Sequence, residues 1–185
     1  MFAELNTNDL ELDAIYLGVL TAKRLKPLSR LEYPVMPRIM DVIRGMGLII
    51  EPIKRFAQNG TVVNHWILGR DRSLIEQYQS DFEGKLLEEN SDWKAKLEAR
   101  YFGYPACCAE AYATSPYTPN DLTPKDQQLF FHYACPGCEE SPKLIPFYQS
   151  AFDEAEVLYK KLRSNSCLED PGQEARSMSL GTEGD

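Results

Sequence analysis

The sequence predicts an α+β fold, in which a mainly helical body carries a small antiparallel sheet containing a β-hairpin near residues 48–68. Two long segments, one near each end of the chain, repeat apolar residues every three or four positions, as amphipathic helices do. A third segment is rich in β-branched residues and is interrupted by Asn59-Gly60, as hairpins are. Because a lone hairpin is marginally stable in water, helices or further strands must cover it.

The first predicted helix begins near residues 8–9, where an Asn-Asp pair is suited to cap a helix N-terminus. Its apolar positions continue to Lys26-Pro27, where the proline disfavours a helical conformation of the residue before it. A second helix is predicted to begin at Pro37 and to end at Gly47, since proline is favoured at helix starts and glycine at helix ends.

The predicted hairpin joins a strand over residues 48–53 to a strand over residues 61–68. Asn59-Gly60 lies between them and is typical of a type I′ turn. Pro52 has no N–H to donate to a neighbouring strand, so we expect the first strand at an edge of the sheet.

After the hairpin, Asp71 is a predicted N-cap for a helical stretch that reaches Arg100, with a break near residues 90–91. Pro105 is then expected as the first residue of a short helix that carries two cysteines. Residues 114–125 contain three prolines and are predicted to form a loop.

Residues 126–131 follow that loop and predict either a short helix or an extended piece. The last helix carries a long apolar stripe and is predicted to end near Arg163. Its start is open between Pro142, with Ser141 as N-cap, and Pro146, which would kink a helix begun earlier.

A chain of 185 residues, 43% of them hydrophobic, is long enough to bury the core of one domain. We therefore assign residues 1–163 to a single α+β domain. Residues 164–185 are rich in serine, glycine and acidic side chains, a composition that predicts a disordered tail.

The formal net charge of -8 disfavours non-specific binding to nucleic acid. No apolar run approaches the ~20 residues of a membrane-spanning helix, and the first residues lack the basic and apolar regions of a signal peptide. We therefore expect a cytoplasmic protein without a membrane segment, in a compartment that keeps thiols reduced.

Four of the five cysteines and one of the two histidines lie within residues 102–141. Cys107 and Cys108 are predicted to lie at a helix start, where free N–H groups favour thiolates. Cys135 and Cys138 have the C-x-x-C spacing of a metal-binding turn. If the two pairs meet, they suit zinc, iron or an iron–sulfur cluster, with His132 as a further ligand or beside the ligands.

Three other interpretations fit the same residues. A thiol-dependent enzyme or dithiol redox protein would use Cys107 as the attacking thiol and His132 as its base. The site can also be a structural zinc centre of a protein whose function lies on another surface, or buried cysteines that only pack. Adjacent helical residues point ~100° apart, so one ion bound by both Cys107 and Cys108 requires a distorted helix start. Of the two, Cys108 is expected to face inward.

The motif FGYP-x-CC over residues 102–108, followed by H-x-x-C-x-x-C over residues 132–138, resembles an uncharacterised and largely archaeal family of prokaryotic proteins of unknown function. The resemblance covers residues 102–141 and implies no reaction. It implies a small cytoplasmic protein of a prokaryote. The motif positions it marks are Gly103, Pro105, Cys107, Cys108, His132, Cys135, Cys138 and Ser141.

Overall fold

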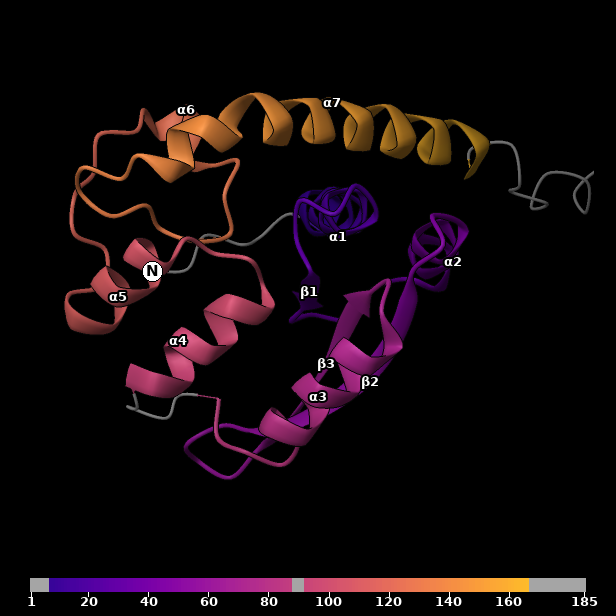
Figure 1. Ribbon diagram of the computed structural model, residues 1–185. Helices are drawn as coiled ribbons and strands as arrows, with labels where there is room; N and C mark the ends of the chain where they lie inside the picture. The colour runs from indigo at the N-terminus through magenta and orange to yellow at the C-terminus, as the bar shows by residue number, and fades with distance from the viewer. Residues whose placement is uncertain (1–6, 88–91, 167–185) are drawn as a thin grey trace, which may run out of the picture.

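The computed structural model describes residues 7–87 and 92–166. In these ranges the chain forms seven helices and one three-stranded antiparallel sheet, which confirms the predicted α+β class (Figure 1). The elements are α1 (Thr7–Ala22), β1 (Leu28–Leu31), α2 (Pro37–Gly45), β2 (Ile49–Phe56), β3 (Val62–Gly69), α3 (Arg72–Phe82), α4 (Asp92–Tyr101), α5 (Ala106–Thr114), α6 (Pro124–Gln127) and α7 (Glu140–Ser166).

The sheet has the strand order β1-β3-β2, and both pairings are antiparallel. The predicted hairpin is present as β2 and β3, in a register that places Ile53 opposite His65. Pro52 lies in the edge strand β2, as its missing N–H predicts. The sequence did not predict β1, whose four residues pair with the far side of β3.

The predicted type I′ turn is wrong. That turn needs positive φ at both central residues, but Gly60 has a φ of 82° whereas Asn59 is outside the positive-φ region. The connection is longer, because the Ala57 N–H donates to the Thr61 carbonyl at 2.9 Å and the Asn59 side chain accepts from the Thr61 N–H at 3.0 Å.

Helices cover both faces of the sheet (Figure 1). On one side α1 packs against the sheet and lies between it and α7, and α2 packs beside α1. On the other side α3 packs against β2 and β3. Alternation along β3 sends Leu68 into the core on the α1 side and Ile67 into the core on the α3 side. None of the helices in the described ranges is long and apolar enough to span a membrane.

Helix boundaries differ from the predictions where the local signals compete. Asp71 caps α3 as predicted, since its carboxylate accepts the Ser73 N–H at 2.9 Å. Pro105 is the residue before α5 rather than its first residue. Helix α7 begins at Glu140, so Ser141 is not its N-cap, and the helix continues through Pro146. The predicted helical stretch up to a break near residues 90–91 is wrong over residues 83–87, because α3 already ends at Phe82; the break itself lies outside the described residues. Residues 164–166 of the predicted tail belong to α7, and the rest of that tail lies outside the described residues.

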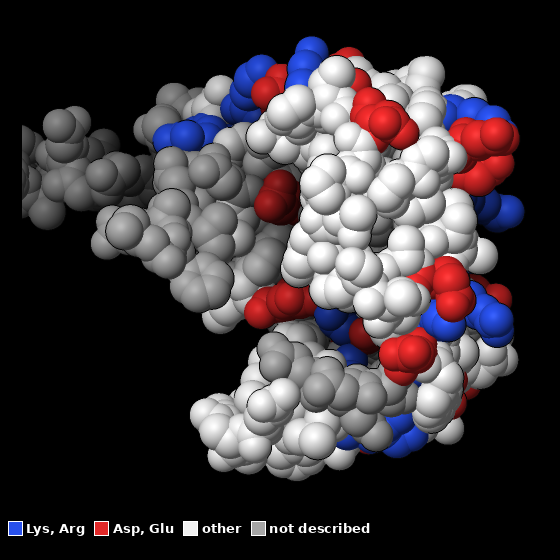
Figure 2. Space-filling model, turned by 90° about the vertical axis from the view of Figure 1, so that its left-hand side faces the viewer, with Lys and Arg blue, Asp and Glu red and all other residues white. Residues whose placement is uncertain are grey.

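The face that carries α4 and α5 is hollowed between two lobes, and acidic and basic side chains gather in the hollow (Figure 2). Helix α4 ends in a turn at Gly103, which has a φ of 69°. The Tyr104 N–H donates to the Ala99 carbonyl and the Gly103 N–H to the Arg100 carbonyl, as in a Schellman motif. This turn aims the chain from α4 into the helix that carries Cys107 and Cys108.

Gly103→Ala is expected to destabilise the protein more than Gly84→Ala. Both glycines have nearly equal φ values, 69° and 68°, so alanine costs about 1–2 kcal/mol of backbone strain at either position. A Cβ at position 103 would also lie 2.6 Å from Pro27 Cδ, whereas no atom of the described residues lies within 4 Å of one at position 84. We expect about 1–3 kcal/mol of additional loss at Gly103, measured by urea unfolding. Equal losses would show that the contact with Pro27 relaxes freely.

Candidate metal centre

Two segments far apart in the sequence bring four sulfur atoms together. Cys107 and Cys108 lie in the first turn of α5, and Cys135 and Cys138 lie in the turn before α7. All four Sγ atoms lie within 4.8 Å of one another. The Sγ–Sγ distances are 4.0 Å for Cys107–Cys108, 3.8 Å for Cys107–Cys138, 3.9 Å for Cys108–Cys135 and 3.4 Å for Cys108–Cys138.

These distances match the edges of a coordination tetrahedron. Zinc–sulfur bonds of about 2.3 Å at tetrahedral angles separate neighbouring sulfurs by about 3.8 Å. The four cysteines therefore form a group able to hold one metal ion. Cys108 is buried, as expected, and Cys107 is exposed, yet both sulfurs belong to the group. The burial of Cys108 and the exposure of Cys107 therefore do not prevent both sulfurs from facing the same site.

The turn before α7 presents backbone N–H groups to the sulfurs. The Ser141 N–H donates to Cys138 Sγ at 3.3 Å, and the Cys135 N–H donates to Cys108 Sγ at 3.4 Å. The turn itself closes through the Cys138 N–H and the Cys135 carbonyl at 3.1 Å, with Gly137 at a φ of 66°. Donors of this kind stabilise thiolates, which are the form that binds metals.

The four thiols do not ionise equally. Burial raises the pKa of the Cys108 thiol and that of the Cys135 thiol. Burial opposes ionisation of Cys138 as well, but hydrogen bonds from the hydroxyl and N–H of Ser141 outweigh it and lower the pKa of Cys138 to about 7. A bound cation would favour all four thiolates, so metal binding at this site releases protons.

His132 lies behind Ser141 and not in the group of sulfurs. His132 Nε2 is 3.0 Å from Ser141 Oγ, which lies 3.3 Å from Cys138 Sγ. Burial and the neighbouring Lys26 lower the pKa of His132 to about 4, so the ring is neutral at pH 7. A thiolate only accepts hydrogen bonds, so beside one the Ser141 hydroxyl donates to sulfur and accepts from Nε2–H. This assignment leaves His132 Nδ1 as an acceptor, and that atom is buried without a partner among the described residues.

The arrangement predicted for a thiol-dependent enzyme is not assembled in the described part of the chain. The His132 ring packs against Phe130 and Tyr104 and bonds to Ser141, and no hydrogen bond joins it to Cys107 within the described ranges. The sequence missed the role of Ser141 because a serine before a proline near a helix start also predicts an N-cap. Its position three residues after Cys138 was the signal that its N–H and hydroxyl could bond to the Cys138 sulfur.

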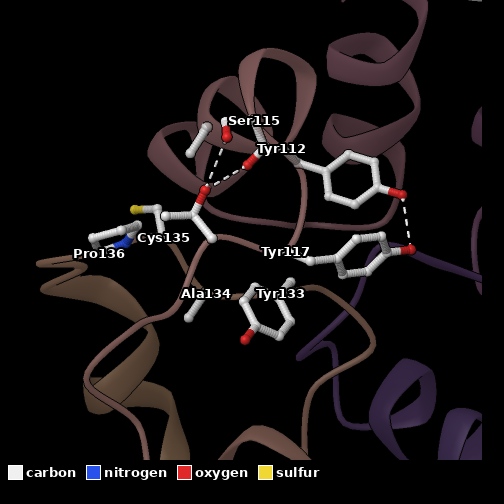
Figure 3. A pocket seen from close by; sticks show the side chains of 9 residues that line it. Tyr112, Ser115, Tyr117, Tyr133, Ala134, Cys135 and Pro136 are labelled. Carbon is white, nitrogen blue, oxygen red and sulfur yellow. Dashed lines mark hydrogen bonds between the residues drawn. The ribbon is translucent and has the colours of Figure 1, made fainter.

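Three tyrosines, Tyr112, Tyr117 and Tyr133, form a wall of packed rings between α5 and the turn that holds Cys135 (Figure 3). The hydroxyl groups of Tyr112 and Tyr117 lie 3.3 Å apart, and the ring of Tyr117 packs edge-on against Tyr133 at 5.7 Å between ring centroids. The space left beside these side chains is about 10 Å³, room for about one water molecule. This wall is therefore packing that keeps the two cysteine segments together, not a ligand site.

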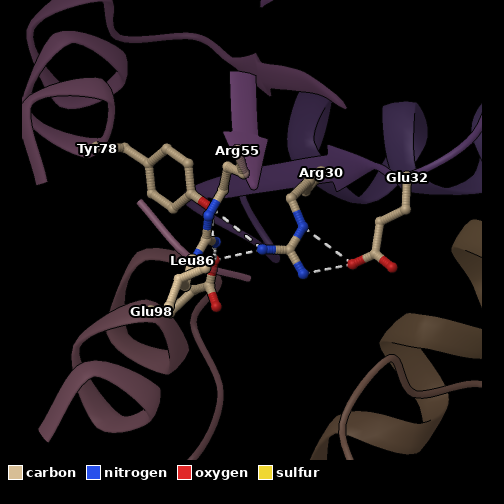
Figure 4. Close-up of polar contacts among 6 residues, drawn as sticks. All are labelled: Arg30, Glu32, Arg55, Tyr78, Leu86 and Glu98. Atoms are coloured by element: carbon tan, nitrogen blue, oxygen red, sulfur yellow. Dashed lines mark hydrogen bonds and ion pairs between the residues drawn. The ribbon is translucent and has the colours of Figure 1, made fainter. Parts of the chain in front are cut away.

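A charged network anchors α4, and with it the turn that leads to the cysteines (Figure 4). Glu98 of α4 accepts hydrogen bonds from Arg55 of β2 at 2.8 Å, from Tyr78 of α3 at 2.5 Å, and from Arg30 of β1. Arg30 also pairs with Glu32. One carboxylate thus joins four separate elements of the fold.

Comparisons with known proteins add no further assignment to this geometry. Searches against models of protein families, against curated proteins and against solved structures found no match to the chain.

Proposed function

We propose that the protein binds a single transition-metal ion through Cys107, Cys108, Cys135 and Cys138. The observation that carries the proposal is the spacing of the sulfurs: four of the six Sγ pairs are 3.4 to 4.0 Å apart, close to the tetrahedral value of about 3.8 Å, and all four atoms lie within 4.8 Å of one another. In an iron–sulfur cluster the four thiolates are divided between two or four irons, which places at least some of the ligand sulfurs further apart than one ion does. We therefore favour zinc, with mononuclear iron as the second choice.

The role we propose for the ion is structural. Catalytic zinc sites keep a position open for water or substrate, whereas four thiolates fill a tetrahedral ion. The ion would tie α5 to the start of α7, two segments that the chain otherwise joins through a loop and the four-residue helix α6. A site of this kind needs reduced thiols, which fits the proposed cytoplasmic location and the prokaryotic family that the motif resembles.

Metal analysis of protein purified without oxygen and without added metal is expected to find about one zinc ion per chain and a colourless solution. Cobalt exchanged for zinc is expected to give the visible absorption of tetrahedral cobalt with sulfur ligands. A result of one iron per chain with a visible absorption band would support the same four ligands, with iron in place of zinc. Metal-free protein with four freely titrating thiols in these positions would refute the proposal.

The dithiol interpretation retains one observation in its favour, since Cys107 is exposed and its Sγ lies 3.8 Å from Cys138 Sγ. A small movement would allow a disulfide between them. The same sample distinguishes the two functions. A metal site protects both thiols from oxidised glutathione until a chelator is added, whereas a redox pair forms its disulfide directly.

A further inference from the structure

Lys26 is a buried lysine whose amino group has an unusual environment. Its side chain is 2% exposed, and it forms no ion pair with a carboxylate in the described ranges. Nζ donates to the Phe102 carbonyl at 3.0 Å and lies 4.3 Å from the centre of the Tyr104 ring. The rings of Phe102 and Phe131 lie 5.6 and 5.9 Å from the same nitrogen. Lysines are rarely buried without a paired charge, so this position calls for a reason.

Lys26 is one of the residues that line a cavity of about 390 Å³, which we call the lysine cavity. A volume of this size suits a small organic molecule. The aromatic side chains of Tyr33, Phe102, Tyr104 and Phe131 form much of its wall. Its charged lining, besides Lys26 itself, is Asp13, Arg30 and Glu32.

The charges around Lys26 act against its protonation. Arg30 holds a positive charge in the same cavity, where it is paired with Glu32 and with Glu98. Burial first, and the charge of Arg30 second, lower the pKa of Lys26 to about 7. A large part of the amino group is therefore unprotonated at neutral pH, when exposed lysines carry a full charge. Desolvation and a neighbouring cation are the two conditions that activate a lysine as a nucleophile.

We propose that Lys26 is a nucleophilic amine that condenses with the carbonyl group of a small aldehyde or ketone bound in the lysine cavity. The Nζ lone pair attacks the carbonyl carbon and forms a C–N bond. One proton moves from the nitrogen to the former carbonyl oxygen and a second is taken from solvent, so the C–O bond breaks, the oxygen leaves as water, and a positively charged iminium remains. The face of the Tyr104 ring, 4.3 Å from Nζ, is placed to stabilise that charge.

The lining also defines the class of carbonyl compound. Arg30 is already paired with two carboxylates, so the cavity has no free cation besides Lys26, among the described residues, to hold an anionic substituent. The aromatic walls favour an apolar or aromatic body instead. This inference goes beyond the metal site, because neither the amine nor its cavity requires a bound ion.

Reductive trapping on the native protein tests the proposal. Benzaldehyde and sodium cyanoborohydride are added at pH 7; the hydride reduces the iminium to a stable secondary amine, and peptide mass spectrometry locates it. The chain supplies internal controls in Lys54 and Lys125, which are exposed. We expect Lys26 to react at least about tenfold faster than either, because a pKa of about 7 leaves a large part of its amine unprotonated at pH 7 and only part of that gain is lost to its weaker basicity.

Unfolding in urea should abolish the preference, so that Lys26 and the two controls react alike. The variant Lys26→Arg has no condensing amine, and it should lose the single fast adduct while its metal content stays that of the unchanged protein. Metal content thus reports the metal proposal separately. If native Lys26 reacts no faster than Lys54 and Lys125, or reacts only in urea, the residue is a packed lysine and the proposal is overturned.

Discussion

Replacing Cys108 with serine is expected to lower the metal content of the purified protein from about one ion per chain to near zero. Cys108 is the most central ligand candidate, because its sulfur lies 3.4 to 4.0 Å from the other three and is buried. A serine hydroxyl is a poor ligand for a soft-metal site and its oxygen reaches less far than sulfur. The loss is read directly by metal analysis of protein purified under identical conditions.

The same substitution is expected to reduce stability by several kcal/mol. Structural zinc contributes binding free energies on the order of 10 kcal/mol to small domains, and part of that contribution appears as stability of the folded state. Thermal unfolding should show a large decrease in Tm for Cys108→Ser, and the wild-type protein with a strong chelator should show a similar decrease. The chelator should have little further effect on the variant, since both treatments remove the same ion.

The fifth cysteine supplies the matched control. Cys167 lies outside the described residues and outside the two cysteine pairs. Cys167→Ser removes one thiol from the chain and should leave both the metal content and the Tm unchanged. The metal-centre proposal fails if Cys108→Ser keeps its ion, and the structural role fails if a chelator that strips the metal leaves the wild-type Tm where it was.

The sequence predicted the cysteine site better than it predicted the strands and helix boundaries around it. Cysteine spacing at a helix start and in a tight turn is local, so both halves of the site were recognisable before folding. Their meeting in space was an expectation that the structure supports, with the four sulfurs in one group. The orientation of the His132 ring could not be predicted from its neighbours in the sequence, because it depends on the hydrogen bond to Ser141 and on packing against the Tyr104 ring.

Long-range pairing explains most of what was missed in the fold. Strand β1 has four residues, too few for an alternating pattern, and it exists because β3 offers a free edge. Helix α7 continues through Pro146, which a local rule reads as a start or a kink. Its neighbours Tyr148 and Ala151 are buried against α1, and this packing outweighs the lost hydrogen bond.

The environment of Lys26 could not be predicted from the sequence either, because it too depends on long-range contacts. In the sequence it precedes a proline after a helix, and the pair predicts only a helix end. Its chemistry depends on Phe102 and Tyr104, which lie more than seventy residues away along the chain. No local pattern reports that a lysine will be buried without a carboxylate.

Glu98→Gln is expected to destabilise the protein by about 3 kcal/mol or more. The Glu98 carboxylate is the shared acceptor of Arg30, Arg55 and Tyr78, and the Arg55 side chain is only 3% exposed. A guanidinium group cannot lose its proton to escape the low-dielectric interior. Glutamine keeps the shape of the side chain but removes the charge, so the buried Arg55 loses its counter-ion and the partly buried Arg30 keeps only Glu32.

Glu110→Gln is the matched control for that substitution. Glu110 also forms an ion pair, with Lys96 at 2.6 Å, but its side chain is 64% exposed. Exposed pairs of this kind contribute at most about 1 kcal/mol, so the control should shift the urea midpoint little. Urea unfolding of both variants at pH 7 with equal m-values gives the comparison directly. A loss at Glu98 no larger than that at Glu110 would mean that water reaches the arginines and screens them. The network would then position α4 without stabilising the fold, because an arginine that water reaches does not depend on the charge of Glu98.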